Sequence, residues 1–472
     1  MESLSFRLGD ERLTLSAELL ERYGTTGPRY TSYPPVPRWR DRDQFGPSEH
    51  RAALAAAAAP TRSVYVHVPF CERRCLYCGC NVVITRSPER AEGYLDWVAR
   101  EVELVGQHVS ETRPATQVHW GGGTPTFLSP GQLERLWAIQ VERFPLAEGA
   151  EVGVEIDPRV TDREQLATLA GVGFNRLSLG VQDTDPKVQE AIGRIQPVEL
   201  TRDTIAAARE LGFGSINVDL IYGLPHQSEE RFSQTLRHVL ELAPERIALF
   251  NYAHLPQRFK HQRAIPSEAL PSGMDKLRLF TSAIDVLSTQ GYRFIGLDHF
   301  AREDDELARA HDAGTLQRNF MGYSTRAGSD AFAFGASAIA DVGGRYVQNE
   351  PDLKAYGAAI AAGELPTRRG LELSGDDLLR RALILRLLCN DRVSRQGLAA
   401  DFPQLLAPGF EQVFARDLER LAPLVADGLV RLEGDWIVIT PLGRLFARNV
   451  AMCFDEPLHS GQGPRVQYSK TH

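Results

Sequence analysis

From about residue 63 the chain alternates short apolar, β-branched runs with longer amphipathic stretches. Six of the runs have the length and composition of buried strands: residues 64–68, 117–120, 152–156, 176–181, 216–221 and 247–250. Helical periodicity lies between them, over residues 94–105, 130–144, 162–170 and 200–211. Repeated β–α units of this length predict parallel strands joined by right-handed crossovers. We therefore predict an α/β fold whose centre is an open, partial (β/α)6 barrel.

Polar or glycine-rich groups lie at the C-terminal ends of all six predicted strands. They are a cysteine-rich loop at residues 71–80, the segment 121–125, Glu155 with Asp157, Gln182, Asp219, and residues 251–254. The C-terminal ends of parallel strands meet at one edge, and ligands bind at that edge in barrels and open sheets. For any single residue, a strand-end cap or a turn is an equally good explanation. Six such groups in register favour a common ligand site.

The pattern changes after about residue 375. Two helical stretches are followed by a predicted hairpin and a third helix, over residues 378–388, 410–424, 428–432 with 436–440, and 441–449. This order resembles a winged helix, which on a basic chain would suggest DNA binding. We interpret it instead as a small helical domain that packs on the barrel.

Three domains follow from this organisation. They are an N-terminal arm at 1–55, the partial barrel at 56–370 and a mostly helical, winged-helix-like C-terminal domain at 371–472.

Composition limits the class of protein. The 472 residues are 43% hydrophobic and 24% charged, as in ordinary globular proteins. The formal net charge of −8 favours neither nucleic acid nor an anionic membrane surface. The first residues lack a signal-peptide pattern, and no apolar run approaches the ~18 residues of a membrane span. We expect a soluble, cytoplasmic protein in a reducing compartment, because cysteine is sparse.

Four of the six cysteines lie in one short loop. Cys71, Cys75 and Cys78 have the spacing C-x3-C-x2-C, and Cys80 follows two residues later. Three thiolates can hold three irons of a cubic 4Fe–4S cluster and leave the fourth iron free. This arrangement is similar to that of radical S-adenosylmethionine (radical SAM) enzymes, in which the fourth iron binds the methionine part of SAM. The loop therefore suggests chemistry that begins with hydrogen-atom abstraction.

Zinc and disulfides are the alternative uses of these thiols. A structural zinc site needs four ligands, usually as two separated pairs, and the chain has no second C-x2-C. Cys80 follows Cys78 too closely to complete a tetrahedron easily. Cys389 and Cys453 lie far away in apolar surroundings and are interpreted as buried free thiols, which disfavours disulfides.

Longer motifs extend over nearly the whole chain. They occupy residues 65–81, 119–126, 155–159, 173–183, 219–225, 250–256, 296–301 and 318–323, with further matches at 29–34 and 452–454. Together they resemble the oxygen-independent coproporphyrinogen III oxidases (coproporphyrinogen dehydrogenases), a radical SAM family of haem biosynthesis.

The resemblance implies a cofactor set and its site. Cys71, Cys75 and Cys78 would ligate the 4Fe–4S cluster, with SAM rather than Cys80 at the fourth iron. Two SAM molecules would bind. Positions around the first are Tyr65, Gly122, Glu155 and Ile339. Positions around the second are Tyr77, Gly123, Thr124, Gln182, Arg194, Asp219 and Ala253. No catalytic residue is implied beyond these cluster and SAM positions.

The resemblance also implies a reaction and partners. The SAM-derived 5′-deoxyadenosyl radical would start the decarboxylation of the ring A and ring B propionates of coproporphyrinogen III to vinyl groups, giving protoporphyrinogen IX. A low-potential electron donor such as a flavodoxin or ferredoxin and an unknown terminal electron acceptor would be needed. The protein would be a monomer without nucleic acid or a membrane span. Arg29, Arg318 and Arg326 are candidate propionate partners, although solvation at the surface explains each of them better.

Three alternatives stay open at this point. A haem-binding, chaperone-like radical SAM relative would typically lack the fourth cysteine and the N-terminal arm, so Cys80 and residues 29–34 argue against it. A radical SAM enzyme acting on another carboxylated or tetrapyrrole substrate is the second alternative. A zinc-stabilised binding protein that uses the winged-helix-like end is the third.

Overall fold

The computed structural model describes residues 3–109 and 112–459. Residues 1–2 of the predicted arm and 460–472 of the predicted C-terminal domain lie outside the described residues. The chain divides into two compact units. Unit 1 contains the described parts of Met1–Trp39, Ser272–Thr325 and Leu373–His472, and unit 2 contains Arg40–Pro271 and Arg326–Glu372. Every residue predicted to bind the cluster or SAM belongs to unit 2.

Six parallel strands of unit 2 are neighbours in the order of the sequence. They are β4 (Thr61–Val68), β7 (Ala115–Gly122), β8 (Leu146–Ile156), β9 (Arg176–Gln182), β10 (Ser215–Tyr222) and β11 (Arg246–Asn251). Each predicted run lies within one of these strands, so the predicted α/β class is confirmed.

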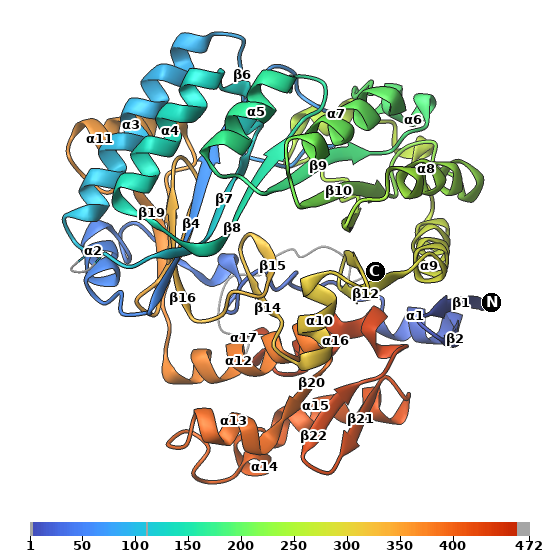
Figure 1. The fold of residues 1–472 in the computed structure, drawn as a ribbon. Coiled ribbons are helices and arrows are strands. Elements are labelled where there is room, and N and C mark those ends of the chain that lie inside the picture. Colours follow the sequence, from blue (N-terminus) through green and yellow to red (C-terminus); the bar gives the residue numbers. More distant parts are fainter. Residues whose placement is uncertain (1–2, 110–111, 460–472) are drawn as a thin grey trace. The chain divides into compact units, whose positions relative to one another are not determined.

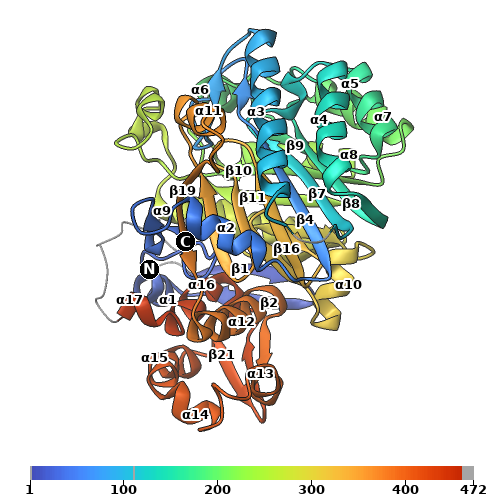
Figure 2. The same ribbon diagram turned by 90° about the vertical axis from the view of Figure 1, so that its left-hand side faces the viewer.

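Helices connect these strands. They are α3 (Pro88–Gly106), α4 (Pro130–Arg143), α5 (Arg163–Val172), α6 (Pro186–Ala191), α7 (Val198–Glu210) and α8 (Glu229–Leu242). Both ribbon views show α3, α4 and α5 along the outside of β4, β7 and β8 (Figures 1 and 2).

Local sequence signals place the helix ends. Ser129 begins α4 with a capping box in which its hydroxyl accepts from the backbone of Gln132 and the Gln132 side chain accepts in return. Asp162 begins α5 with Gln165 in the same way. Helix α5 ends at Gly173, whose φ of +114° suits glycine better than other residues. These caps fix where the helices begin and end, so that the chain can enter the next strand.

Unit 2 continues on the other side of β4. Strand β16 (Ser329–Phe334) pairs with β4 in parallel. Four antiparallel strands follow: β17 (Ile339–Val342), β18 (Arg345–Asn349), β19 (Thr367–Glu372) and β3 (Arg40–Asp41). The remaining elements of unit 2 are α2 (Pro47–Ala55), β5 (Phe70–Cys71), β6 (Val83–Ile84), α11 (Leu353–Ala361), η2 (Pro125–Phe127), η3 (Lys260–Ala264) and η4 (Ser267–Ala269). The sequence pattern did not predict this extension of the sheet.

Unit 1 begins with the hairpin of β1 (Leu4–Leu8) and β2 (Glu11–Leu15). Its other elements before residue 326 are α1 (Ala17–Tyr23), η1 (Val36–Arg38), α9 (Gly273–Thr289), β12 (Tyr292–Gly296), β13 (His299–Arg302), α10 (Glu306–Ala313), β14 (Gln317–Asn319) and β15 (Gly322–Ser324). No helix in the described part of the chain is long and apolar enough to span a membrane.

The C-terminal part of unit 1 contains the predicted helices and hairpin. Its elements are α12 (Gly375–Asn390), β20 (Arg392–Ser394), α13 (Arg395–Asp401), α14 (Phe410–Val413), α15 (Ala415–Ala426), β21 (Val430–Glu433), β22 (Trp436–Ile439), η5 (Gly443–Phe446), α16 (Ala447–Cys453) and α17 (Glu456–His459). The predicted helix at 410–424 is two helices, and β20 adds an unpredicted third strand beside the hairpin. The domain boundaries at residues 55 and 370 stay a prediction.

Candidate cofactor site

The cysteine loop follows β4 and is held by its own backbone. The amide of Val83 donates to the carbonyl of Pro69 at 2.7 Å, and the amide of Thr85 donates to that of Cys71 at 3.0 Å. Within the loop, the amide of Cys78 donates to the carbonyl of Cys75 at 3.2 Å. Cys75 is buried, Cys71 and Cys78 are half-buried, and Cys80 is exposed. The three predicted ligands are therefore less accessible than the fourth cysteine.

Each predicted ligand sulfur has a polar neighbour. The Sγ of Cys71 lies 3.4 Å from the hydroxyl of Thr124, and the Sγ of Cys78 accepts from the amide of Cys80 at 3.4 Å. The Sγ of Cys75 accepts from Arg159 at 3.4 Å and from Arg194 at 3.6 Å. Two guanidinium groups, which stay charged in proteins, therefore lie at hydrogen-bond distance from this sulfur.

The two half-buried thiols differ in their acidity. The hydrogen bond with Cys80 lowers the pKa of Cys78 to about 6, against the opposing effect of burial. Burial raises the pKa of Cys71 to about 11. A metal ion deprotonates a coordinated thiol outright, so the second shift is compatible with ligation. Among residues 3–109 and 112–459, no three Cys, His, Asp or Glu side chains gather as ligands of a single metal ion.

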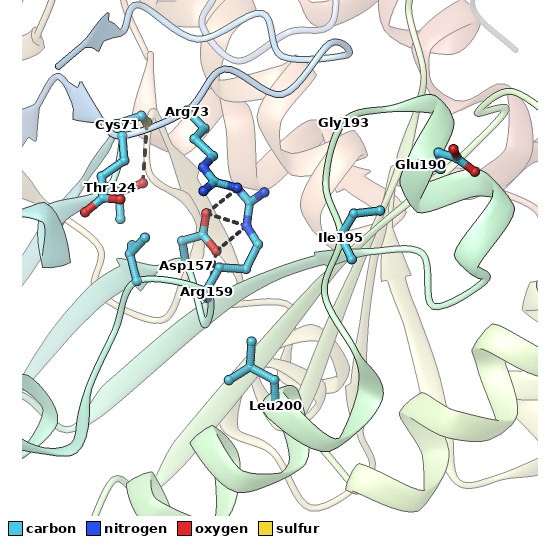
Figure 3. A pocket seen from close by; sticks show the side chains of 11 residues that line it. Cys71, Arg73, Thr124, Asp157, Arg159, Glu190, Gly193, Ile195 and Leu200 are labelled. Carbon is cyan, nitrogen blue, oxygen red and sulfur yellow. Dashed lines mark hydrogen bonds and ion pairs between the residues drawn. The ribbon is translucent and has the colours of Figure 1, made fainter. Parts of the chain in front are cut away.

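A buried ion-pair network supports the loop from β8 and from the segment before α7. The guanidinium of Arg194 donates to both carboxylate oxygens of Asp157 at 3.1 Å, and that of Arg159 donates to the same carboxylate at 2.7 Å. Figure 3 shows Arg159 and Asp157 paired across the cavity from Cys71 and Thr124. Burial opposes ionisation of Asp157, but Arg194 and Arg159 outweigh it and keep its pKa below the usual value.

Arg194 also has an unused donor. Its side chain is almost fully buried, and its Nε has no hydrogen-bond partner among the described residues. Its Nη2 donates to the carbonyl of Gly180 at 2.5 Å. A buried guanidinium with a free N–H fits a carboxylate, such as that of the methionine part of SAM.

The glycine segment after β7 lies against the cysteine loop. The amide of Gly123 donates to the carbonyl of Val68 and that of Thr124 to the carbonyl of Phe70, both at 2.8 Å. A Cβ on Gly123 would lie 2.7 Å from the carbonyl oxygen of Phe70. Gly122 has a φ of +113°, and a Cβ there would lie 2.4 Å from the ring of His67. Glycine is favoured at Gly123 because another backbone lies too close for a side chain, and at Gly122 because of the positive φ and the nearby His67 ring.

Four side chains of β4, β7 and β8 form a second polar cluster. The rings of Tyr65 and His119 are stacked with centroids 6.1 Å apart, and the hydroxyl of Tyr65 lies 3.1 Å from the Nδ1 of His67. The carboxylate of Glu155 accepts from the amide of Gly122 at 3.0 Å and lies 3.3 Å from His119. Burial opposes the ionisation of Glu155, but His119 and the Gly122 amide lower its pKa. Tyr65, Gly122 and Glu155, which the resemblance assigns to one SAM, are thus neighbours.

Gln182 is the last residue of β9, whereas Asp219 lies inside the neighbouring strand β10, three residues before its end at Tyr222, and not at the strand end as predicted. The carboxylate of Asp219 accepts from Asn217 at 2.7 Å and from Ser178 at 3.3 Å. Burial, followed by the charge of Glu155, raises the pKa of Asp219 to about 7. Gln182 is a non-glycine residue with φ +69°, and its amide approaches Gly180 so closely that a Cβ on that glycine would lie 2.8 Å away.

The remaining predicted residues lie on three separate segments. Tyr77 packs against an apolar cluster that includes Ile192 and Tyr252. The side chain of Gln262 donates to the carbonyl of Tyr77 at 3.0 Å and to that of Ala253 at 3.4 Å, which ties these two positions together. Ile339 is half-buried and begins β17.

Sequence reasoning missed several residues of this site. His67, His119, Arg159 and Gln262 were not singled out, and Asp157 was named only as a strand-end group. The two histidines lie in the motifs at 65–81 and 119–126. Their only signal was closeness in the chain to a candidate, since His67 is two residues after Tyr65 and His119 is three residues before Gly122. The pairing of Arg194 with Asp157 joins residues 37 positions apart and leaves no local signal.

Two of the candidate propionate partners donate hydrogen bonds to backbone carbonyl groups. Arg318 in unit 1 donates to the carbonyl of Tyr30 at 3.4 Å. Arg326 in unit 2 donates to the carbonyl of Gly149 at 3.0 Å, near the start of β8 and not at its C-terminal end. The structure does not bring Arg326 to the edge where the cysteine loop lies.

Two parts of the chain match the sequence profiles of known protein families. The profile of the family described as the radical SAM superfamily matches residues 65–239, and that described as the HemN C-terminal domain matches residues 373–446. The fold and the site thus define a radical SAM protein, and this membership implies a 4Fe–4S cluster and SAM.

Curated relatives and a solved structure show to which family of radical SAM proteins the chain is similar. The oxygen-independent coproporphyrinogen III oxidase of Pseudomonas aeruginosa is 44% identical over 448 residues, which cover 94% of this chain and 96% of the relative. That of Escherichia coli is 43% identical over 454 residues, covering 95% and 96%. The structure of coproporphyrinogen III oxidase (HemN) from Escherichia coli, a radical SAM enzyme, matches with a TM-score of 0.87 and 42% identity, covering 93% of this chain and 98% of that one. The chain belongs to the oxygen-independent coproporphyrinogen III oxidase family.

Proposed function

We propose that this protein converts coproporphyrinogen III to protoporphyrinogen IX without oxygen, by oxidative decarboxylation of the ring A and ring B propionates to vinyl groups. One observation carries this proposal: the chain is 44% identical, over almost its full length, to an enzyme named for that activity. The ordered cysteine loop, with two guanidinium groups at Cys75, supports it. When bound, the cluster and SAM supply a 5′-deoxyadenosyl radical that can remove a hydrogen atom from a propionate side chain.

The residues of the chain would hold and orient these groups. Cys71, Cys75 and Cys78 would ligate the cluster, and Arg159 and Arg194 would offset its negative charge. Gly122 and Gly123 leave room for a ligand to approach the backbone.

Two SAM molecules are part of the proposal. The contacts among Tyr65, Gly122 and Glu155 support one binding position. The approach of Gln182 and Arg194 to Gly180 supports a second position, on β9 and β10 beside Asp219. Carboxylates such as Glu155 and Asp219 can accept hydrogen bonds from ribose hydroxyls or an ammonium group.

Electrons would have to reach the cluster from outside. We propose a low-potential protein donor such as a flavodoxin or ferredoxin, and the terminal acceptor stays unassigned. A cavity of about 470 Å³ lies beside Cys71 and is lined by Arg73, Arg159 and the exposed Ile195 (Figure 3). This cavity supports an approach toward the cluster from the side of the segment between α6 and α7. We further propose a cytoplasmic monomer.

An anaerobic assay tests the proposal. The protein is reconstituted with iron and sulfide and incubated with a low-potential reductant, SAM and coproporphyrinogen III, and the oxidised products are separated by chromatography. Protoporphyrin that forms only in the presence of SAM is the expected result. Cleavage of SAM without protoporphyrin would contradict the assigned substrate, and haem binding would then be measured.

A further inference from the structure

Helix α3 carries a fully buried carboxylate that the proposed reaction does not use. Glu101 is 0% exposed. Its oxygens accept from the amide of Gly335 at 2.8 Å, the side-chain amide of Asn349 at 2.5 Å and the hydroxyl of Tyr356 at 2.6 Å. The three donors come from the turn after β16, the end of β18 and helix α11. The side chain of Glu101 therefore forms hydrogen bonds with three segments that follow residue 330.

Tyr94 lies seven residues earlier on the same face of α3. Its hydroxyl donates to the carbonyl of His67 at 2.6 Å and accepts from the amide of Ala336 at 3.0 Å. The turn is so close that a Cβ on Gly335 would lie 2.2 Å from this hydroxyl and 2.6 Å from the carbonyl of His67. Glu101 and Tyr94 thus fix the same turn, and Tyr94 also attaches it to β4.

The turn at residues 335–338 and residue His67, which Tyr94 joins, both lie next to predicted residues of the cofactor site. The turn at residues 335–338 runs directly into Ile339, the first residue of β17. On the other side, the ring of His67 lies 3.1 Å from the hydroxyl of Tyr65 and 3.0 Å from the carbonyl of Asn81, which closes the cysteine loop. Tyr65 and Ile339 are both positions of the first proposed SAM.

We propose that Glu101 is a positioning residue of the SAM site: it fixes the turn at residues 335–338 and, through Tyr94 on the same helix, holds Ile339 in register with Tyr65 and the start of the cysteine loop. The identity of the ligand rests on the proposed function, but the ordering of the turn does not.

The chemistry of Glu101 suits this role. All three partners are hydrogen-bond donors, and only a carboxylate can accept from all of them at once. Burial raises its pKa to about 7, although Tyr356, the Gly335 amide and Asn349 act in the opposite direction. A glutamine would keep the shape but turn an NH2 group toward at least one donor, which leaves a buried polar group unsatisfied.

Hydrogen exchange of the cluster-free protein is the first test. Glu101→Gln should speed the exchange of the amides of residues 335–338 about tenfold, because the turn loses hydrogen bonds that hold it locally. Val98→Ala is the matched control, since Val98 is a buried apolar residue of the same helix. It should lower the melting temperature without this selective change at the turn.

Binding of SAM is the second measurement. Equilibrium dialysis of cluster-loaded protein should give a dissociation constant for SAM about tenfold higher in Glu101→Gln than in the wild type or in Val98→Ala. If Glu101→Gln melts earlier but leaves both the exchange of the turn and the SAM constant unchanged, Glu101 serves stability alone and the proposal is overturned.

Two milder variants cover the case in which Glu101→Gln fails to fold. Tyr94→Phe removes the hydroxyl that joins His67 to Ala336, and Tyr356→Phe removes one donor from Glu101. Both should show smaller changes of the same kind, and no change in either would reject the proposal. If the wild type itself binds no SAM, the proposed function fails, and the exchange data alone then decide whether Glu101 orders the turn.

Discussion

Arg194 holds Asp157 through two parallel hydrogen bonds of 3.1 Å and also reaches the sulfur of Cys75. Arg159 makes the same pair of contacts, to Asp157 and to Cys75. Two cations therefore meet one carboxylate and one cysteine sulfur in a buried place. The placement of Cys75, a predicted cluster ligand, depends in this way on a carboxylate directly after β8.

Asp157→Asn should destabilise unit 2. The neutral amide leaves Arg159 and Arg194 without their counter-charge, and breaking a buried ion pair typically costs about 3–5 kcal/mol. Urea unfolding of the cluster-free protein measures the loss. Glu210→Gln is the control, because Glu210 pairs with Arg163 where both side chains are more than 60% exposed. It should change the free energy of unfolding by less than ~1 kcal/mol, and equal effects of the two variants would contradict the argument.

The four cysteines of the loop should behave differently on substitution. Cys71→Ala, Cys75→Ala and Cys78→Ala should each abolish a stable cluster, because a site with three protein ligands has no spare one. Cys80→Ala should keep most of the iron, since Cys80 is not a predicted ligand and the backbone amide of residue 80 still donates to the sulfur of Cys78. Iron content and absorbance near 400 nm after anaerobic purification distinguish the variants. Loss of iron in Cys80→Ala would overturn the ligand assignment.

Gly122→Ala should disrupt the site by steric strain. A Cβ there meets the ring of His67 at 2.4 Å, and the φ of +113° disfavours any side chain. We expect a loss of more than about 2 kcal/mol in the free energy of unfolding. Gly131→Ala is the matched control. Gly131 lies in helix α4, and a Cβ at this position would have no neighbouring atom within 4 Å. Similar thermal unfolding of both variants would show that the close approach is not needed.

Asp219 should make stability fall as the pH rises toward neutrality. Its folded pKa of about 7 lies above the unfolded value, so the folded state binds the proton more tightly between about pH 4 and 7. The stability contributed by the protonated form is complete below about pH 4 and is lost as the pH rises through 7. Asp219→Asn should remove this loss, so the variant should gain in melting temperature relative to the wild type from pH 5 to pH 8. A difference between the two proteins that does not change with pH would contradict the assignment.

Local patterns were enough to predict much of the fold. Strands such as β4 and β10 contain mostly buried runs rich in apolar and β-branched residues, and helices such as α4 and α5 carry their caps in the sequence. The extension from β16 to β3 was missed, since β3 precedes β4 in the chain and pairs with β19 more than 300 residues later. Pairing at that distance has no periodicity to detect.

Residue types and their local spacing were sufficient to indicate the chemistry of this protein. The spacing of Cys71, Cys75 and Cys78 and the motifs around them indicate a cluster and SAM, because ligand type and local spacing are properties of a short segment. The contacts that support the predicted ligands became visible only in the folded chain. Arg159 and Arg194 meet Asp157 at the sulfur of Cys75, and Glu101 meets the turn before Ile339. Such contacts depend on which strands and helices become neighbours, and burial gives them their strength, because charges and hydrogen bonds interact more strongly away from water.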